Sequence, residues 1–319
     1  MTKAPIQGLH HVTSTASDPI RNVRFFTDVL GLRLVKRTVN FDDVTTYHLY
    51  YGNETGDPGT ALTFFPFESG RPGKVGAGQV ETTAFQVPAD SLDYWTERFD
   101  AHGVDYDDPT ERFDATARTE RVLPFRDPDG LRYELVATDR DTSIEPWDDS
   151  DVPAEFAVRG FHGVTLALTE TAATADLLEV MGYEETASSG AYTRFEADGD
   201  AATVVDLHAV DERGRSGIGT VHHVAFRVPD DEAQTAWREA LSERGYRVTP
   251  QKDRQYFRSI YFREQGGVLF EFATDGPGFT ADEDANELGD SLQLPPWLAD
   301  DRERIEAALP ELGAPEVAR

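Results

Sequence analysis

Short runs of alternating or apolar residues along the chain predict strands, and each group of strands includes one segment with helical periodicity. The first apolar run, at 9–14, leads to Ser17-Asp18-Pro19, where a capping side chain precedes a proline suited to the first turn of a helix. The apolar positions of this helix, and the glycine expected to end it, are Ile20, Val23, Phe26, Leu30 and Gly31. Three further strands are predicted at 32–38, 45–51 and 60–65.

This order of one strand, one helix and three strands occurs four times. The later units open at 79–88, 160–165 and 221–228, and the clearest repeat relates 126–139 to 263–275. The pattern predicts an α+β fold of four βαβββ modules paired into two domains. We assign modules one and two to a domain of residues 1–140, a linker to 141–157, and modules three and four to a domain of residues 158–275. Residues 276–319 form a tail with a helix expected near 300–309.

Composition narrows the classes of function. The 319 residues include no cysteine, which excludes disulfides, thiolate nucleophiles and cysteine-bound metals. The net charge of −29 disfavours nucleic-acid and anionic membrane partners. The N-terminus lacks the apolar region of a signal peptide, and no apolar run is long enough to span a membrane. We therefore expect a cytoplasmic protein, and we interpret the acidic composition as that of a halophile's protein.

Four of the eight histidines lie in two adjacent pairs, His10-His11 and His222-His223, each inside a predicted strand. Since neighbouring side chains of a strand point to opposite faces, one histidine of each pair should face a site and the other should face away or line its wall. Glu271 lies in the middle of an apolar strand, where a lone carboxylate is costly unless paired or bound to a metal. Two imidazoles and one carboxylate are the ligand set of non-haem Fe(II) oxygenases.

Comparison of equivalent strand positions in the four modules shows which of these residues could form one metal site. The equivalent positions on the four opening strands are His11, Thr82, Gly163 and His223. An alignment without gaps gives the closing-strand positions as Phe64, Glu134, Asp206 and Glu271. Modules one and four thus offer His11, His223 and Glu271, which requires that these two modules lie together in space. Modules two and three offer no imidazole at these positions, and we expect Glu134 and Asp206 to be solvated or paired within the protein rather than to bind a hard cation.

The modular plan resembles that of the vicinal oxygen chelate superfamily, and several motifs resemble those of its hydroquinone ring-cleaving dioxygenases. These motifs are the runs 8–14, 31–43, 46–52, 62–66 and 253–264, and Leu294-Pro295-Pro296 in the tail. The resemblance implies Fe(II), or Mn(II) as in some relatives, held by His11, His223 and Glu271. It implies a small aromatic diol and O2 as substrates. It also implies roles beside the metal for His10, His222, Arg254 and Tyr261.

The chemistry of these side chains agrees with such roles. Tyr261 and either His10 or His222 could transfer protons, and Arg254 could stabilise a substrate oxygen or a developing negative charge. The structural alternatives are a surface ion pair for Arg254 and ordinary strand packing for Tyr261. For the remaining histidines, His48, His102, His162 and His208, we favour structural roles.

Three other functions stay open at this stage. The first is an extradiol catechol dioxygenase. The second is a metal-dependent lyase or isomerase of glyoxalase type, which usually has two carboxylate ligands and is disfavoured by Phe64 at the fourth position. The third is a non-catalytic protein that binds an aromatic ligand, which retention of all three ligand residues disfavours. The sequence shows no interface, so it leaves a homo-oligomer open, together with the identity of the metal and of the ring that is opened.

Overall fold

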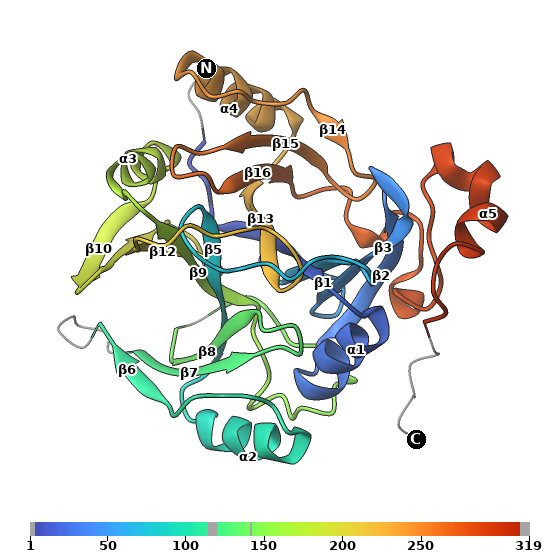
Figure 1. The fold of residues 1–319 in the computed structure, drawn as a ribbon, viewed down its shortest axis with the longest axis horizontal. Helices are drawn as coiled ribbons and strands as arrows, with labels where there is room; N and C mark the ends of the chain where they lie inside the picture. Colours follow the sequence, from blue (N-terminus) through green and yellow to red (C-terminus); the bar gives the residue numbers. More distant parts are fainter. Residues whose placement is uncertain (1–3, 114–119, 141, 313–319) are drawn as a thin grey trace.

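The structure, a computed structural model that describes residues 4–113, 120–140 and 142–312, has the predicted α+β fold of four modules (Figure 1). Module one comprises β1 (Leu9–Ala16), α1 (Pro19–Arg24), the π-helical turn η1 (Phe25–Val29), β2 (Arg33–Asn40), β3 (Asp43–Gly52) and β4 (Ala61–Pro66). Module two comprises β5 (Gln79–Pro88), α2 (Leu92–His102), β6 (Thr110–Arg112), β7 (Glu120–Arg126) and β8 (Arg132–Thr138). Module three comprises β9 (Phe161–Leu168), α3 (Ala172–Met181), β10 (Glu184–Ser189), β11 (Tyr192–Glu196) and β12 (Val204–Ala209). Module four comprises β13 (Thr220–Val228), α4 (Asp231–Glu243), β14 (Lys252–Asp253), β15 (Arg258–Arg263) and β16 (Leu269–Thr274).

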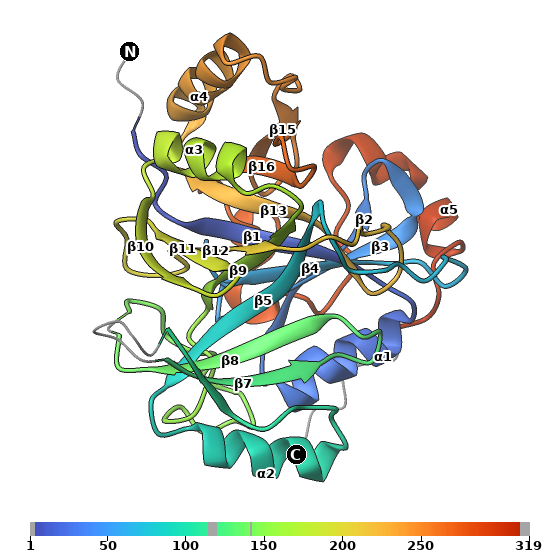
Figure 2. The same ribbon diagram turned by 60° about the vertical axis from the view of Figure 1, so that its left-hand side comes forward.

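The strands form two eight-stranded sheets (Figure 2). The first has the order β14-β15-β16-β13-β1-β4-β3-β2, and the second has the order β10-β11-β12-β9-β5-β8-β7-β6. Antiparallel pairing of β1 with β13 therefore joins module one to module four, and pairing of β5 with β9 joins module two to module three. This confirms that the first and last modules lie together. The division into domains of residues 1–140 and 158–275 stays a prediction.

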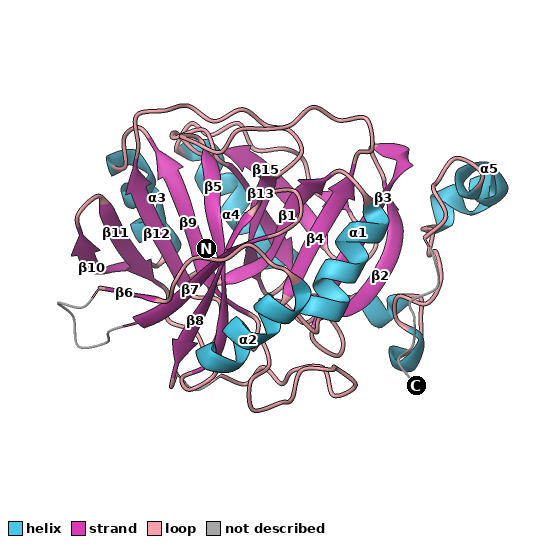
Figure 3. Ribbon diagram, turned by 60° about the horizontal axis from the view of Figure 1, so that its bottom comes forward, coloured by secondary structure: helices cyan, strands magenta, loops and turns pink. Residues whose placement is uncertain are grey.

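The helices cover one face of each sheet and leave the other face for a site (Figure 3). Phe26, which follows α1, packs on Phe64 of β4 with ring centroids 4.8 Å apart. Trp237 of α4 packs on Phe272 of β16 at 5.3 Å. Because side chains alternate along a strand, the neighbours of Phe64 and Phe272 in sequence point to the opposite face. No helix in the described ranges is both long and apolar enough to cross a membrane.

The tail contains the 3-10 segments η2 (Phe279–Ala281), η3 (Ala285–Glu287) and η4 (Pro296–Asp301), followed by α5 (Arg302–Glu306). The helix predicted near 300–309 is thus shorter than expected, because Pro310 disfavours helical conformation in the residue before it and cannot donate a backbone hydrogen bond. Lys36 of β2, which is fully buried, holds the tail against the first sheet. Its Nζ lies 2.7 Å from Asp282 Oδ1 and also pairs with Glu283.

A turn before β8 fastens module two to module one. Asp129 accepts hydrogen bonds from Ser17 N and Oγ at 2.8 and 2.6 Å and from Arg21 Nη2 at 2.7 Å. The neighbouring Asp127 is 5% exposed, and its Oδ1 accepts from two backbone N–H groups while its Oδ2 has no hydrogen-bond partner. Burial raises the pKa of Asp127 to about 7; the backbone N–H of Leu131 lowers it and the charge of Asp129 raises it.

Replacing Asp127 with asparagine is expected to stabilise the protein at pH 8. The raised pKa means that the folded state holds a proton that the unfolded state releases, so stability falls as pH rises from about 4 to about 7. Asparagine keeps the acceptor oxygen and carries no charge, so we expect a gain of about 1–2 kcal/mol at pH 8, offset in part by its unpaired amide. Urea unfolding at pH 8 and pH 5 measures this difference. A difference that does not shrink toward pH 5 would contradict the assignment.

Candidate metal centre

Two β-bulges shape the pairing of β1 with β13. The register runs through Leu9–Phe226, His11–Ala225, Thr13–His223 and Ser14–Val221. His10 is therefore an additional residue on β1, and His222 is an additional residue on β13. A bulge breaks the alternation of side chains and re-aims them. The Nδ1 atoms of His10 and His11 lie 2.9 Å apart, and those of His222 and His223 lie 2.8 Å apart. The prediction that the other histidine of each pair faces away or lines the wall assumed an unbulged strand; in the bulged strands the two rings of each pair are in contact, and His222 lines a cavity next to His223.

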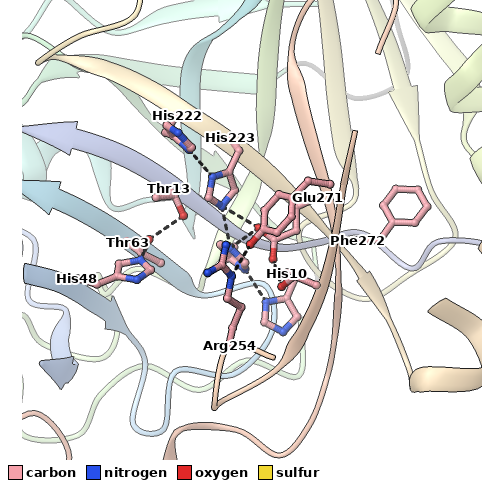
Figure 4. A network of polar contacts seen from close by, with 12 residues as sticks. His10, Thr13, His48, Thr63, His222, His223, Arg254, Glu271 and Phe272 are labelled. Atoms are coloured by element: carbon pink, nitrogen blue, oxygen red, sulfur yellow. Dashed lines mark hydrogen bonds and ion pairs between the residues drawn. The ribbon is translucent and has the colours of Figure 1, made fainter. Parts of the chain in front are cut away.

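Three ligand atoms converge at the centre of the first sheet (Figure 4). The Nε2 atoms of His11 and His223 are 3.2 Å apart. Glu271 Oε2 lies 2.8 Å from His223 Nε2 and 3.3 Å from His11 Nε2. All three residues are buried, and Ser259 of β15 donates a hydrogen bond to the other carboxylate oxygen, Glu271 Oε1. The structure therefore brings together the three residues predicted as metal ligands.

The arrangement fits a divalent cation. Glu271 Oε2 is buried and makes no hydrogen bond, although two imidazole nitrogens lie within 3.3 Å. Three ligand atoms bound at right angles to an ion, each at about 2.1 Å, would be about 3.0 Å apart, which lies within the range of the three distances. Among the described residues, these three make the one group of ligand-type side chains close enough to hold a metal ion. Two histidines and one carboxylate leave further coordination positions open.

The pKa shifts of His223 and Glu271 favour the protonation states in which these two residues can bind a cation. Burial lowers the pKa of His223 in spite of the nearby Glu271 carboxylate. Burial opposes ionisation of Glu271, but His11 and His223 hold the pKa of this carboxyl well below its usual range. Burial, with His11 next in effect, lowers the pKa of His10 to about 3, and burial with His223 lowers that of His222 to about 4. Neutral imidazoles and an ionised carboxylate are competent metal ligands.

A bound cation would fix the tautomers of both histidine pairs. An imidazole that offers the Nε2 lone pair to a cation carries its proton on Nδ1. His11 and His223 would then donate from Nδ1 to the Nδ1 atoms of His10 and His222, whose own protons are placed on Nε2. Such hydrogen bonds orient ligand rings and raise their basicity.

A cavity of about 190 Å³ is lined by His11 and His223, two of the three predicted ligands. Arg254 and Tyr261 line it, and Arg254 Nε donates to Tyr261 Oη at 3.1 Å. The same guanidinium group lies 3.2 Å from Asp42, so Arg254 combines the position predicted for catalysis with the ion pair considered as its structural alternative. The apolar part of the wall is formed by four phenylalanines, Phe41, Phe65, Phe67 and Phe257.

His48 also lines the cavity, which the sequence did not predict. Its Nε2 lies 2.9 Å from Thr63 Oγ1 and its Nδ1 lies 2.8 Å from Tyr50 Oη. Since both ring nitrogens are engaged within the protein, the structural interpretation of His48 is retained. Ser259 was missed as well. It precedes Tyr261 by two residues, so the period of a strand could have placed it on the same face.

The assignment of Phe64 to the fourth ligand position is wrong by one residue. Glu271 lies opposite Ala225, two residues after His223, whereas the residue opposite Thr13, two residues after His11, is Thr63. Phe64 points to the helix face and packs on Phe26. A shift of one residue along a strand moves every side chain to the other face. The fourth position therefore carries a neutral hydroxyl group.

The corresponding region of the second sheet is occupied by arginine. Arg112 Nη1 lies 2.7 Å from Glu134 Oε2 and 3.9 Å from Asp206 Oδ2. Arg194 donates two hydrogen bonds of 2.8 Å to Asp206 and lies 2.6 Å from Glu120. Glu134 and Asp206 are thus paired within the protein, which is one of the two states expected from the sequence. His162 lies 3.1 Å from Glu120, His208 lies 2.6 Å from Glu81, and His102 is exposed.

Comparison with known proteins gives one family. The profile of the Glyoxalase/Bleomycin resistance protein/Dioxygenase superfamily matches residues 8–135 and 163–272. The chain is 44% identical to the Bacillus subtilis protein named "Putative ring-cleaving dioxygenase MhqO", with 95% of each chain covered. It is 37% identical to the chlorohydroquinone/hydroquinone 1,2-dioxygenase of Sphingobium indicum, with 92% of each chain covered.

Solved structures give the same fold. A "putative dioxygenase" from Bacillus subtilis superimposes with a TM-score of 0.91 at 43% identity, covering 97% of this chain and 98% of the other. Glyoxalase I from Zea mays superimposes with a TM-score of 0.60 at 17% identity, covering 84% of this chain and 92% of the other. The second likeness extends to the fold alone.

Proposed function

Because the chain belongs to the glyoxalase, bleomycin resistance protein and dioxygenase superfamily, we propose that it is a metal-dependent dioxygenase that opens hydroquinone-type aromatic rings with O2. The observation that carries this proposal is the convergence of His11, His223 and Glu271 beside a cavity with aromatic walls. The similarity to a chlorohydroquinone/hydroquinone 1,2-dioxygenase over nearly the whole chain supports it.

We assign His11, His223 and Glu271 as the ligands of Fe(II), with Mn(II) as the alternative ion. The chemistry supplied by such an ion when bound is acidification of the substrate phenol and transfer of ring electrons to O2. Ser259 fixes Glu271, and His10 and His222 fix the two ligand rings. These contacts hold the donor atoms in place, so binding requires little rearrangement of the protein.

Arg254 and Tyr261 act on the substrate side of the site. Burial alone would lower the pKa of Arg254, but Tyr261 and Asp42 raise it above its usual value, so its positive charge is retained. The guanidinium group can stabilise negative charge that develops as the diol loses its protons. Burial, and the nearby Glu271 carboxylate, raise the pKa of Tyr261, which keeps its hydroxyl available as a hydrogen-bond donor. Ring opening breaks one carbon–carbon bond and incorporates both atoms of O2, so no other reactant is required.

The proposed activity is tested by oxygen uptake. The purified protein would be loaded with Fe(II) without oxygen and then mixed with hydroquinone, methylhydroquinone or catechol in aerated buffer of high salt concentration. We expect uptake of one O2 per hydroquinone and a ring-opened product. Preference for catechol would assign the extradiol reaction instead. No uptake with any diol by protein containing one iron per chain would contradict the dioxygenase proposal.

We also propose that the acidic surface is an adaptation to high salt. A net charge of −29 destabilises the compact state through self-repulsion, and the Debye length falls from about 10 Å at 0.1 M salt to about 3 Å at 1 M. We expect the thermal unfolding midpoint to rise steadily as KCl is increased from about 0.1 M to about 3 M. A midpoint that is unchanged or lowered over this range would contradict the adaptation.

A further inference from the structure

The two halves of the metal centre are related by an approximate two-fold axis between β1 and β13. Glu271 lies opposite Ala225 on one side and Tyr261 on the other. In the other half, Thr63 lies opposite Thr13 and Tyr50 in the same way. The axis therefore relates His223 to His11, Ala225 to Thr13, Glu271 to Thr63, Tyr261 to Tyr50, and Ser259 to His48.

The two halves differ at three of these positions. Across the strands, Ala225 lies between His11 and Glu271, and its methyl group leaves space for the carboxylate to reach the imidazole. Thr13 occupies the matching place between His223 and Thr63. Its larger side chain fills that path, and its Oγ1 lies 2.8 Å from Thr63 Oγ1.

The hydroxyl group of Thr63 is fully engaged away from the ion site (Figure 4). It shares hydrogen bonds with Thr13 Oγ1 at 2.8 Å and with His48 Nε2 at 2.9 Å. His48 Nδ1 is in turn 2.8 Å from Tyr50 Oη. A hydroxyl has one proton to donate, and this chain of hydrogen bonds orients it within the sheet. In the other half, Ser259 donates to Glu271 Oε1 and leaves Oε2 for the ion.

We infer that Thr13, His48 and Thr63 determine the number of protein ligands at the metal centre. They close the position at which a second carboxylate would complete a four-ligand site, and they keep the remaining coordination positions for two reactants. They are positioning and specificity-determining residues rather than catalytic residues. The part of the inference that concerns the two reactants rests on the proposed function, whereas the part that concerns the ligand number does not.

The test introduces into module one the residues that surround and include the carboxylate ligand of module four. The triple substitution Thr13→Ala, His48→Ser and Thr63→Glu reproduces Ala225, Ser259 and Glu271 in module one. Each protein is loaded with Mn(II), and release of the metal into excess EDTA is followed by electron paramagnetic resonance. We expect release from the triple variant to be slowed at least about tenfold relative to wild type, because a fourth ligand must also dissociate. We expect diol-dependent O2 uptake of the iron-loaded variant to be lost.

The matched control carries Thr13→Ala, His48→Ser and Thr63→Gln. Glutamine has the size of glutamate without the charge, so release of Mn(II) should not be slowed. Equal slowing in both variants, or unchanged release from a folded glutamate variant, would overturn the inference. If the triple variant does not fold, Thr13→Ala with Thr63→Asp is measured in the same way, since module three carries Asp206 at this position. A wild type that retains Mn(II) in this assay but, when loaded with one iron per chain, consumes no O2 with any diol contradicts the proposed function and leaves the ligand-number comparison intact.

Discussion

Substitution of Glu271 by alanine is expected to reduce diol-dependent O2 uptake by at least 10²–10³-fold, about the loss seen when one group that stabilises a transition state is removed. The carboxylate is the one anionic ligand of the proposed site, and its Oε2 lies within 3.3 Å of both ligand imidazoles. Without it, two neutral histidines would have to bind a divalent cation alone. Oxygen uptake and metal content per chain, measured on the same preparation, test this expectation.

The second sheet offers a matched control for this substitution. Glu134 is the equivalent carboxylate of module two, but it pairs with Arg112 at 2.7 Å instead of facing histidines. Replacing Glu134 with glutamine should leave metal content at one ion per chain and leave turnover within about twofold of wild type, since Glu134 lies in the other sheet and pairs with Arg112 instead of a metal ligand. If this control lost as much metal as the Glu271 variant, the assignment of the metal site to the first sheet alone would be contradicted.

Substitution of Arg254 by methionine is expected to lower kcat/KM for hydroquinone about 10²-fold while metal content is unchanged. Arg254 contacts Tyr261 and lines the cavity, but none of the three ligand side chains depends on it for a hydrogen bond. Methionine keeps much of the length and removes the charge. The Arg254→Lys variant, which retains a charge but not the planar fork of donors, should recover part of the activity.

Steady-state kinetics together with metal analysis separate the two roles considered for Arg254. If the residue only forms a surface ion pair with Asp42, methionine should change kcat/KM no more than removal of Asp42 does. The Asp42→Asn variant is therefore the comparison. Equal and small effects of both substitutions would assign Arg254 to the surface, whereas a large effect of Arg254→Met alone would assign it to the reaction.

The repeat in the sequence predicted most of the fold and the ligand set. Strands and helices recur in one order, so equivalent positions could be compared between modules. Only modules one and four carry histidine at the opening-strand position, and of these two only module four also carries glutamate at the closing one. The expectation that modules one and four lie together followed from this comparison, because His11 and His223 could share an ion only in that arrangement, and the pairing of β1 with β13 provides it.

The features of the site that the sequence did not predict are shifts of one residue along a strand. The bulges at His10 and His222 leave no signal in a pattern of apolar and polar positions, yet they bring each pair of imidazoles into contact. The error at Phe64 had the same cause. The alignment without gaps was one residue out of register on β4. It therefore assigned the ligand position to Phe64, which packs on Phe26 on the helix face, instead of to Thr63 on the opposite face.

The ion pairs of the second sheet also could not be predicted from the sequence pattern. Arg112 and Arg194 are far apart in sequence and lie on strands that had no predicted role in a site. Only the folded sheet shows that their guanidinium groups neutralise Glu134 and Asp206. The sequence disfavoured a cation site at these carboxylates, but it could not decide between solvation and pairing or name the partners.

The pairing of the first strand with the thirteenth has a consequence for synthesis of the protein. His11 and His223 are 212 residues apart, and Glu271 follows later still. A nascent chain emerging from the ribosome cannot hold the metal until nearly all of it has been translated. A chain that stops before β13 lacks two of the three ligands. Uptake of the ion would therefore mark completed polypeptides and leave prematurely terminated ones unloaded.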